Sequence, residues 1–413
     1  MPIFKPFRGV RPQENYIDIF PTHPLDNYSQ LEINKKAQQD SSYVQMIKPY
    51  VVSKSKDVDR NLRKIRTNYE ELVADKKLMQ DNSSYYLYEQ IYPNKTVFRG
   101  LLGLTSVEEF IDGKIKKHES TIKKKKAKLA HYLEKVNLQA EPVLLTYQSN
   151  SRVELLMNHE EKNLPLFSYE DSKNIKHKLW KIDNRLKMQQ LKEAIADIDA
   201  FYIADGHHRI GSTALNAKFQ KEKNKKHTGQ EHYNFVYSFI VSNQSIKIND
   251  FNRIAKNLHG LTAAEFLKKL ETSFNIYDKG ETPYFPSKKF HISMYLEGKF
   301  YSLHVKHELR SEEIDINHLD HHLLDTLIFK NIYGIENTDA SEDITYLKGN
   351  STVDGIVKLK EFVDENDFAA GFGVYPVSFK EILQISDNKI TMPPKCTYIE
   401  PKLITALLMY DMK

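Results

Sequence analysis

The residues best suited to chemistry form one short stretch, DGHHR at 205–209, between an apolar run and a helix-forming run. Residues 200–204 predict a buried strand, and residues 210–215 predict the start of a helix. The glycine permits a tight turn, and backbone N–H groups at the start of a helix bind phosphate well. Arg209 offers a planar set of donors to phosphate oxygens, and Asp205 could hold a metal or accept a proton. We therefore predict an anion-binding turn; the alternative is a strand–turn–helix with an incidental polar cluster.

A second candidate lies in GKIKKHEST, residues 113–121. The sequence predicts a long helix over Lys116–Val136, with His118 and Glu119 near its start, where the helix dipole favours a carboxylate. Glu119 could then act as the general base for a substrate hydroxyl. In the alternative, Glu119 only charges the helix start. The lysines that follow would form a solvated stripe, of which a few could contact a phosphate-rich substrate.

A third candidate is the tail MPPKCTYIEPKL, residues 392–403. The stiff pair Pro393-Pro394 and the cations Lys395 and Lys402 favour a loop that closes over an anionic ligand. The alternative is a proline-punctuated edge strand with surface lysines. Cys396 has no activating partner nearby in the sequence, so we expect it to be inert and packed.

The stretch HLDHHLLD, residues 318–325, could place acids and histidines on one helix face. Its spacing matches no specific zinc signature, so we favour a polar helix start over a metal site. The sequence also lacks a GxxxxGK[ST] phosphate loop, a GxGxxG dinucleotide fingerprint and a kinase catalytic loop. A nucleotide would have to be held in another way.

Composition sets the broad class. The chain has 413 residues, of which 40% are hydrophobic and 28% charged, enough for two or three domains. A single cysteine excludes an internal disulfide framework and a cysteine-based zinc cluster. There is no membrane-length apolar run and no secretory leader pattern at the start, so we expect a cytoplasmic protein. The net charge of +5 is modest, and no arginine-rich arm points to nucleic acid.

The elements that must position these residues alternate between strands and helices, which predicts an α+β (mixed α/β) fold. The predicted strands are Ser84–Ile91, Thr96–Leu104, Pro142–Tyr147, Lys178–Ile182, Tyr233–Val241, Phe290–Tyr295, Lys299–Val305 and Leu403–Met409. The first two are expected to pair, and Phe290–Tyr295 is expected to form a hairpin with Lys299–Val305. The other predicted helices are Val58–Gln80, Val107–Ile111, Met188–Ile195, Thr262–Phe274 and Leu319–Ile328. Thr262, with Glu265 three residues later, predicts a capping box at the start of its helix. Lys218–Gln230 predicts a mobile charged loop, and the opening KPFRGVRP an ordered loop.

Together these motifs resemble a bacterial family of unassigned function that is related to the archaeal free serine kinase, within the ParB/sulfiredoxin-like superfamily. The resemblance runs nearly end to end, through KPFRGVRP, HPLDNYS, GKIKKHEST, LWKID, YIADGHHR and MPPKCTYIEPKL. The link to serine kinase activity rests on DGHHR and the upstream glutamate. The chain departs from the family at Lys128, where an arginine is usual, and at Cys396, where a serine is usual.

The resemblance implies phosphoryl transfer between a nucleotide, ADP or ATP with Mg²⁺, and free L-serine or O-phosphoserine. Glu119 would be the base, and residues 205–209 would bind the phosphate. The expected catalytic residues are Glu119, Asp205, His207, His208 and Arg209. The expected substrate or phosphate ligands are His118, Gly206, Thr121, Arg8, Arg11, Lys395 and Lys402.

Two other functions stay open: a nucleotide-sensing or nucleic-acid-binding regulator of the ParB kind, and a phosphatase of a small phosphoester. No helix-turn-helix is evident in the sequence, which counts against the regulator. We expect an N-terminal α/β portion at 1–104, a ParB/serine-kinase-like core at 105–245, and a C-terminal α/β portion at 246–413 whose tail returns to the core. The sequence leaves the oligomeric state open.

Overall fold

A computed structural model describes residues 2–52, 57–393 and 395–413. The chain forms two compact units. Unit 1 holds the residues up to Lys117, then Thr121–Ile246 and Pro401–Lys413; unit 2 holds His118–Ser120 and Lys247–Glu400. Among the described residues, no helix is both long enough and apolar enough to cross a membrane.

Unit 1 is built around a nine-stranded mixed sheet. Its strands run in the order β6 (Ile115–Lys116), β11 (Phe201–Asp205), β8 (Val143–Tyr147), β12 (Phe235–Ser242), β5 (Val97–Ser106), β4 (Tyr85–Ile91), β10 (Lys176–Ile182) and β9 (Phe167–Glu170), and β1 (Phe4–Lys5) pairs with β5. A smaller sheet has the order β3 (Leu78–Gln80), β2 (Gly9–Pro12), β21 (Met409–Asp411) and β7 (Leu138–Gln139). The last strand of the chain therefore lies between two early ones.

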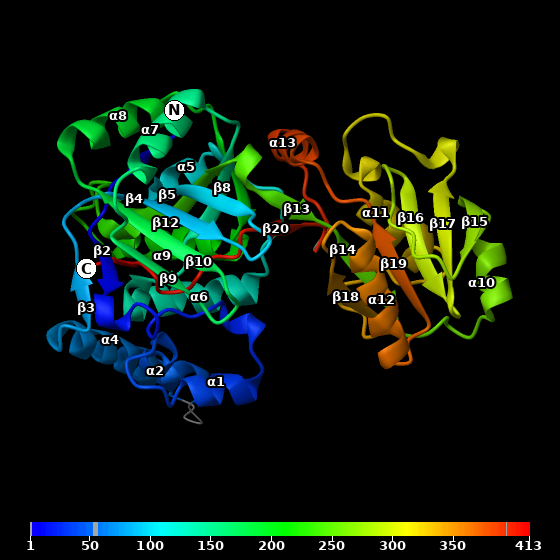
Figure 1. The fold of residues 1–413 in the computed structure, drawn as a ribbon, viewed down its shortest axis with the longest axis horizontal. Coiled ribbons are helices and arrows are strands. Elements are labelled where there is room, and N and C mark those ends of the chain that lie inside the picture. Colours follow the sequence, from blue (N-terminus) through cyan, green and yellow to red (C-terminus); the bar gives the residue numbers. More distant parts are fainter. Residues whose placement is uncertain (1, 53–56, 394) are drawn as a thin grey trace. The chain divides into compact units, whose positions relative to one another are not determined.

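The helices of unit 1 lie on both sides of the main sheet (Figure 1). They are α1 (Gln30–Lys36), α2 (Tyr43–Met46), α3 (Lys48–Val51), α4 (Val58–Ala74), α5 (Val107–Ile111), α6 (Lys123–Val136), α7 (Ser151–Glu161), α8 (Arg185–Ala196) and α9 (His207–Lys223). One core packs β8, β11 and β12 against α7, α8 and α9. A second core packs α4 and α6 against the smaller sheet.

Unit 2 is a six-stranded antiparallel sheet with helices. The strand order is β15 (Phe274–Gly280), β17 (Lys299–Val305), β16 (His291–Leu296), β19 (Ala370–Val374), β14 (Phe251–Ala255) and β18 (Ile344–Lys348). A short ribbon joins β13 (Lys247–Asn249) to β20 (Tyr398–Glu400). The helices are α10 (Ala263–Leu270), α11 (Asp320–Leu324), a π-helix at Asp325–Lys330, α12 (Val353–Glu365) and α13 (Phe379–Asp387).

The mixed α/β class is confirmed, and so are the hairpin of β4 with β5 and the hairpin of β16 with β17. The predicted capping box at Thr262 is also present. The expected portions at 1–104 and 105–245 fall in unit 1 except for His118–Ser120, and β5 spans residue 104. The three-part division of the chain stays a prediction.

Five predicted elements differ from the structure. The opening segment is not all loop, because Gly9–Pro12 forms β2. The helix predicted over Val58–Gln80 ends at Ala74, and Leu78–Gln80 forms β3. Lys116–Ile122 is not helical, because Lys116 pairs with β11 in the sheet. Lys218–Gln230 is not all loop, since α9 continues to Lys223. Leu403–Met409 is buried but not a strand: Ala406 has a φ of 62°, and regular strand pairing begins only at Met409. The run of apolar residues without alternation correctly predicts that this segment is buried, but it does not determine the backbone conformation of the segment.

Candidate functional site

The turn at 205–209 joins the buried strand β11 to the 17-residue helix α9. The register of β11 against β8 shifts between Ile203 and Asp205, an irregularity that re-aims the last side chain of the strand. Gly206 follows with a φ of 97°, a conformation that glycine adopts without strain. A Cβ at Gly206 would also lie only 3.0 Å from Arg209 Nε, so the glycine lets the arginine fold back over the turn.

Asp205 has both carboxylate oxygens occupied by cations of unit 1. Lys402 Nζ lies 2.8 Å from one oxygen, and the Arg209 guanidinium donates to the other. Burial alone would raise the pKa of Asp205, but Lys402 and Arg209 outweigh it and hold the pKa at about 2. Asp205 is therefore a fixed anion that positions two cations, and it is a poor proton acceptor at neutral pH. It offers no free oxygen to a Mg²⁺ ion, so we place no metal on it.

Arg209 spans from the turn to the residues before β8. Besides Asp205, its guanidinium donates to the carbonyl oxygen of Pro142, and Nη1 lies 3.5 Å from a carboxylate oxygen of Glu141. Three acceptors hold one arginine in a single orientation. Glu141 was not among the residues predicted from sequence, because nothing in its neighbourhood marks it before the fold brings Arg209 close.

Helix α6 starts beside the start of α9. Thr121 and Lys126 lie against Gly211 of α9, and at the other ends of the helices Lys223 pairs with Glu134 at 2.6 Å. The two helices are therefore parallel, and their positive dipole ends lie together. Neither helix has a side-chain N-cap or an acidic residue in its first turn, and α6 opens with four lysines, Lys123–Lys126.

The two histidines of the turn differ. His207 is buried, with 5% of its surface exposed, whereas His208 is partly exposed. Burial lowers the pKa of His208, and the charge of Lys125 lowers it further. A neutral imidazole beside the start of α6 can donate one N–H to a bound anion and accept a proton at the other nitrogen.

Two predicted phosphate ligands in the opening segment lie elsewhere in unit 1. Arg11 pairs with the buried Asp81 at 3.0 Å, which is a structural contact. Arg8 is exposed at the rim of a pocket of about 280 Å³ that also contains Lys5 and His232. The strand before Arg8 pairs with β5, three positions from β11, or roughly 14 Å at the usual strand spacing. The structure does not bring either arginine to the turn.

His118, Glu119 and Lys395 belong to unit 2. The prediction that His118 and Glu119 start a helix is wrong, because α6 begins only at Lys123. Glu119 instead forms a β-bridge with Met392, whose N–H donates to the carbonyl of His118 at 2.8 Å. The long-range pairing of His118-Glu119, here called the HE motif, with Met392 of the tail outweighs the local preference of these residues for a helix. His118 is buried, which lowers its pKa to about 4.

The tail therefore meets the HE motif through Met392 in unit 2, and Asp205 through Lys402 in unit 1. Lys395 lies 3.2 Å from Asp339 and 4.0 Å over the Tyr346 ring, so its ammonium is already engaged. Pro394, half of the predicted double proline, lies outside the described residues.

Cys396 is buried, and burial raises the pKa of its thiol to about 12, as expected for an inert cysteine. In the fourth candidate, Asp320 and His321 are fully buried on the short helix α11. Within the described ranges, no group of three or more histidine, cysteine or acidic side chains could hold a metal ion.

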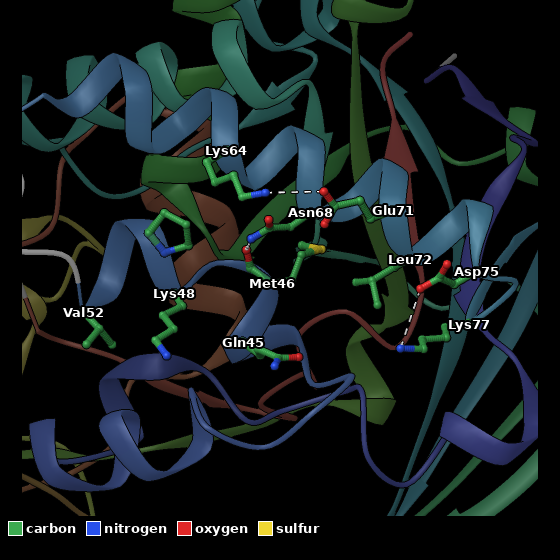
Figure 2. A pocket seen from close by; sticks show the side chains of 11 residues that line it. Gln45, Met46, Lys48, Val52, Lys64, Asn68, Glu71, Leu72, Asp75 and Lys77 are labelled. Atoms are coloured by element: carbon green, nitrogen blue, oxygen red, sulfur yellow. Dashed lines mark hydrogen bonds and ion pairs between the residues drawn. The ribbon is translucent and has the colours of Figure 1, made fainter.

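A groove of about 640 Å³ lies between α2, α3 and α4 in unit 1 (Figure 2). Two of its three lysines pair with its two acids, which leaves a net charge of +1: Lys64 lies 3.4 Å from Glu71, and Lys77 lies 3.8 Å from Asp75. Asn68 donates to a backbone carbonyl of α2 at 2.8 Å. The groove has a smaller surplus of positive charge than the start of α6 with its four lysines, so the turn is the stronger candidate.

Comparison with known proteins identifies the family to which the sequence of this chain is similar. The model of a family described as a protein of unknown function, DUF1015, matches residues 4–325. This confirms the expectation of a family without an assigned function. A search of curated protein sequences finds no match.

Several solved structures resemble the chain distantly. A free serine kinase in complex with AMP has a TM-score of 0.35 and 12% identity, covering 74% of this chain and 91% of that chain. A conserved hypothetical protein from Pyrococcus furiosus has a TM-score of 0.36 and 10% identity, with coverage of 75% and 94%. SbnI with a C-terminal truncation, from Staphylococcus aureus, has a TM-score of 0.37 and 12% identity, with coverage of 74% and 87%. Likenesses at such low scores carry no argument about activity.

Proposed function

The chain belongs to DUF1015, a family of proteins of unknown function. For this member of the family we propose that the starts of α6 and α9 bind the phosphates of a nucleotide for phosphoryl transfer. One observation carries the proposal: two long parallel helices start side by side, without side-chain caps or first-turn acids, among Lys125, Lys126 and Arg209. The backbone N–H groups of a helix start, aligned helix dipoles and surrounding cations are the features that bind phosphate.

Asp205 supports this site by holding Lys402 and Arg209 in place. A carboxylate with a pKa of about 2 stays charged at neutral pH, so both cations keep their positions before any ligand arrives. Preorganised cations stabilise the charge that develops on a transferring phosphoryl group without reorganising during the reaction. If Mg²⁺ takes part, it would be held through phosphate oxygens and water, as that ion commonly is.

In the proposed reaction, the hydroxyl oxygen of free serine attacks the terminal phosphorus of ADP or ATP. The hydroxyl proton goes to Glu119, a role that rests on the sequence resemblance. The bond from the terminal phosphorus to the bridging oxygen breaks, and its electron pair stays on the leaving AMP or ADP. The products are O-phosphoserine and the shortened nucleotide, and the reverse direction uses the same groups.

The test incubates the full chain with serine, Mg²⁺ and either ADP or ATP, and detects O-phosphoserine by mass spectrometry. ADP and AMP are the first nucleotides to titrate, since they are the ligands of the solved free serine kinase. We expect Arg209→Ala to lower turnover by about 10²-fold or more. Arg185→Ala is the matched control, because Arg185 is exposed at the start of the side-chain-capped helix α8.

Glu119→Gln keeps the shape of the side chain and removes its basicity. We expect it to lose turnover while ADP affinity stays within about twofold. Glu312→Gln, an exposed glutamate of unit 2, is its control. If neither ADP, ATP nor pyrophosphate binds the wild-type chain, the phosphate site is wrong. Release of inorganic phosphate without phosphoserine would favour the phosphatase alternative instead.

A further inference from the structure

Unit 1 contains a cavity of about 190 Å³ between the first two turns of α9 and residues 129–133 of α6. Most of its wall is aromatic or aliphatic, including the rings of Tyr43, Tyr50 and Tyr132 and the side chain of Leu129. Polar groups gather where the residues just before β8 meet α9. A largely apolar cavity with a few convergent polar groups is the usual form of a small-molecule site.

Arg209 connects this cavity to the phosphate turn. The same guanidinium that donates to Asp205 lies 3.5 Å from Glu141 and lines the cavity. Thr213, one helical turn further along α9, lines the cavity as well. A ligand with its anionic end at the start of α9 could therefore place an attached group in the cavity, on the other side of the Arg209 side chain.

Glu141 gives the cavity a hydrogen-bond preference. The Thr405 hydroxyl donates to Oε1 of Glu141 at 2.7 Å. The other oxygen, Oε2, has Arg209 Nη1 at 3.5 Å, longer than an ordinary charge-assisted hydrogen bond. Oε2 can therefore accept a hydrogen bond from a ligand, and the acceptor favours a ligand that carries an N–H donor.

The aromatic wall favours a flat ring. Tyr50 and Tyr132 have ring centroids 5.8 Å apart with planes inclined by 59°, and the buried Tyr43 also lines the cavity. A dry cavity of about 150 Å³ accommodates benzene, so the larger volume here suits a purine ring. A zwitterionic amino acid would lose its hydration against this wall without enough partners.

We propose that this cavity receives the purine base of the nucleotide, with the 6-amino group of adenine donating to Glu141. The proposal rests on the proposed function, because it assumes that the phosphates lie at the starts of α6 and α9. It goes further by naming the base and the two features that select it: aromatic walls for the ring and a carboxylate for the amine. The site then discriminates adenine from hypoxanthine, which has a 6-oxo group that cannot donate.

The test measures calorimetric affinities of the full chain for ADP, IDP, adenosine and pyrophosphate. We expect wild type to bind ADP about tenfold or more tightly than IDP, since IDP leaves Glu141 facing an acceptor. Glu141→Gln should narrow or reverse this preference, because an amide can donate to the 6-oxo group. Tyr50→Leu should weaken ADP about tenfold and leave pyrophosphate unchanged. Tyr277→Leu, an exposed tyrosine of unit 2, is the matched control.

The outcomes separate the two proposals. Equal binding of ADP by Tyr50→Leu and wild type, or equal binding of ADP and IDP by wild type, overturns the base cavity while the phosphate site stands. Adenosine binding without pyrophosphate binding supports the cavity and overturns the phosphate site. Absence of binding by all four probes overturns both.

Discussion

Replacing Asp205 with asparagine tests the charge arrangement of the turn directly. The variant removes the anion that Lys402 and Arg209 share, and keeps the size of the side chain. The pKa of Asp205 falls from its ordinary 3.8 to about 2, a difference worth about 2.4 kcal/mol for a fully buried group. A third of the side chain is exposed, at 34%, so solvent screening reduces the expected loss to about 1–2 kcal/mol.

The sign of the pH dependence follows from the direction of the shift. Since folding lowers the pKa of Asp205, its contribution is complete above pH 3.8 and is lost as the pH falls through about 2. The difference in unfolding free energy between wild type and Asp205→Asn should therefore be largest at neutral pH. At pH about 3 it should fall to about half of that value.

Urea unfolding of the full chain can follow this difference through tryptophan fluorescence. The chain has one tryptophan, Trp180, which is buried in the same core of unit 1 as β11 and therefore reports on the right unit. Asp183→Asn is the matched control, because Asp183 pairs with Lys181 at an exposed position and should change stability by less than about 0.5 kcal/mol. Equal stability of Asp205→Asn and wild type at neutral pH, or a difference that does not shrink in acid, would refute the arrangement.

Three further predictions concern single residues. Gly206→Ala should cost about 2 kcal/mol of unfolding free energy by urea titration, since both its φ and Arg209 oppose a side chain, whereas Gly113→Ala, with a positive φ but open space, should cost about 1 kcal/mol. Cys396 should resist thiol reagents at pH about 8 until the chain is unfolded, and stoichiometric labelling of the native chain would contradict its burial. Burial of His118 lowers its pKa from 6.5 to about 4, so the unfolded state takes up the proton first. Stability should then fall by up to about 3 kcal/mol as pH drops through this window. His118→Gln, followed by circular dichroism, should remove that part of the pH dependence.

The strand, turn and helix around Asp205 could be predicted from sequence because each signal there is local. The apolar run, the glycine and the helix-forming residues all lie within about 15 positions, and they agree with one another. The capping box at Thr262 and the two hairpins were predictable for the same reason. Local backbone preferences determine these elements, and their tertiary contacts are compatible with those preferences.

The partners of the turn could not be predicted in the same way. Lys402 is 197 residues from Asp205 in the sequence, and Glu141 is recognisable only after Arg209 folds over the turn. Glu119 was misplaced on a helix because its pairing with Met392 depends on a segment that lies far along the chain. The periodicity of apolar residues indicates the type of each element and its buried face. It does not indicate which distant segment pairs with a given strand.

The path of the chain through unit 1 has a consequence for its synthesis. The chain leaves unit 1 after Ile246 and returns only at Pro401, bringing Lys402 and the strand β21 with it. A ribosome makes the N-terminal part first, so β2 and β7 lack their shared neighbour until residues 409–411 have been made. During that interval Asp205 has Arg209 but not Lys402. The turn therefore acquires its full set of charges only after Lys402 has been made, and a product that ends before Pro401 would carry the DGHHR sequence without a completed site.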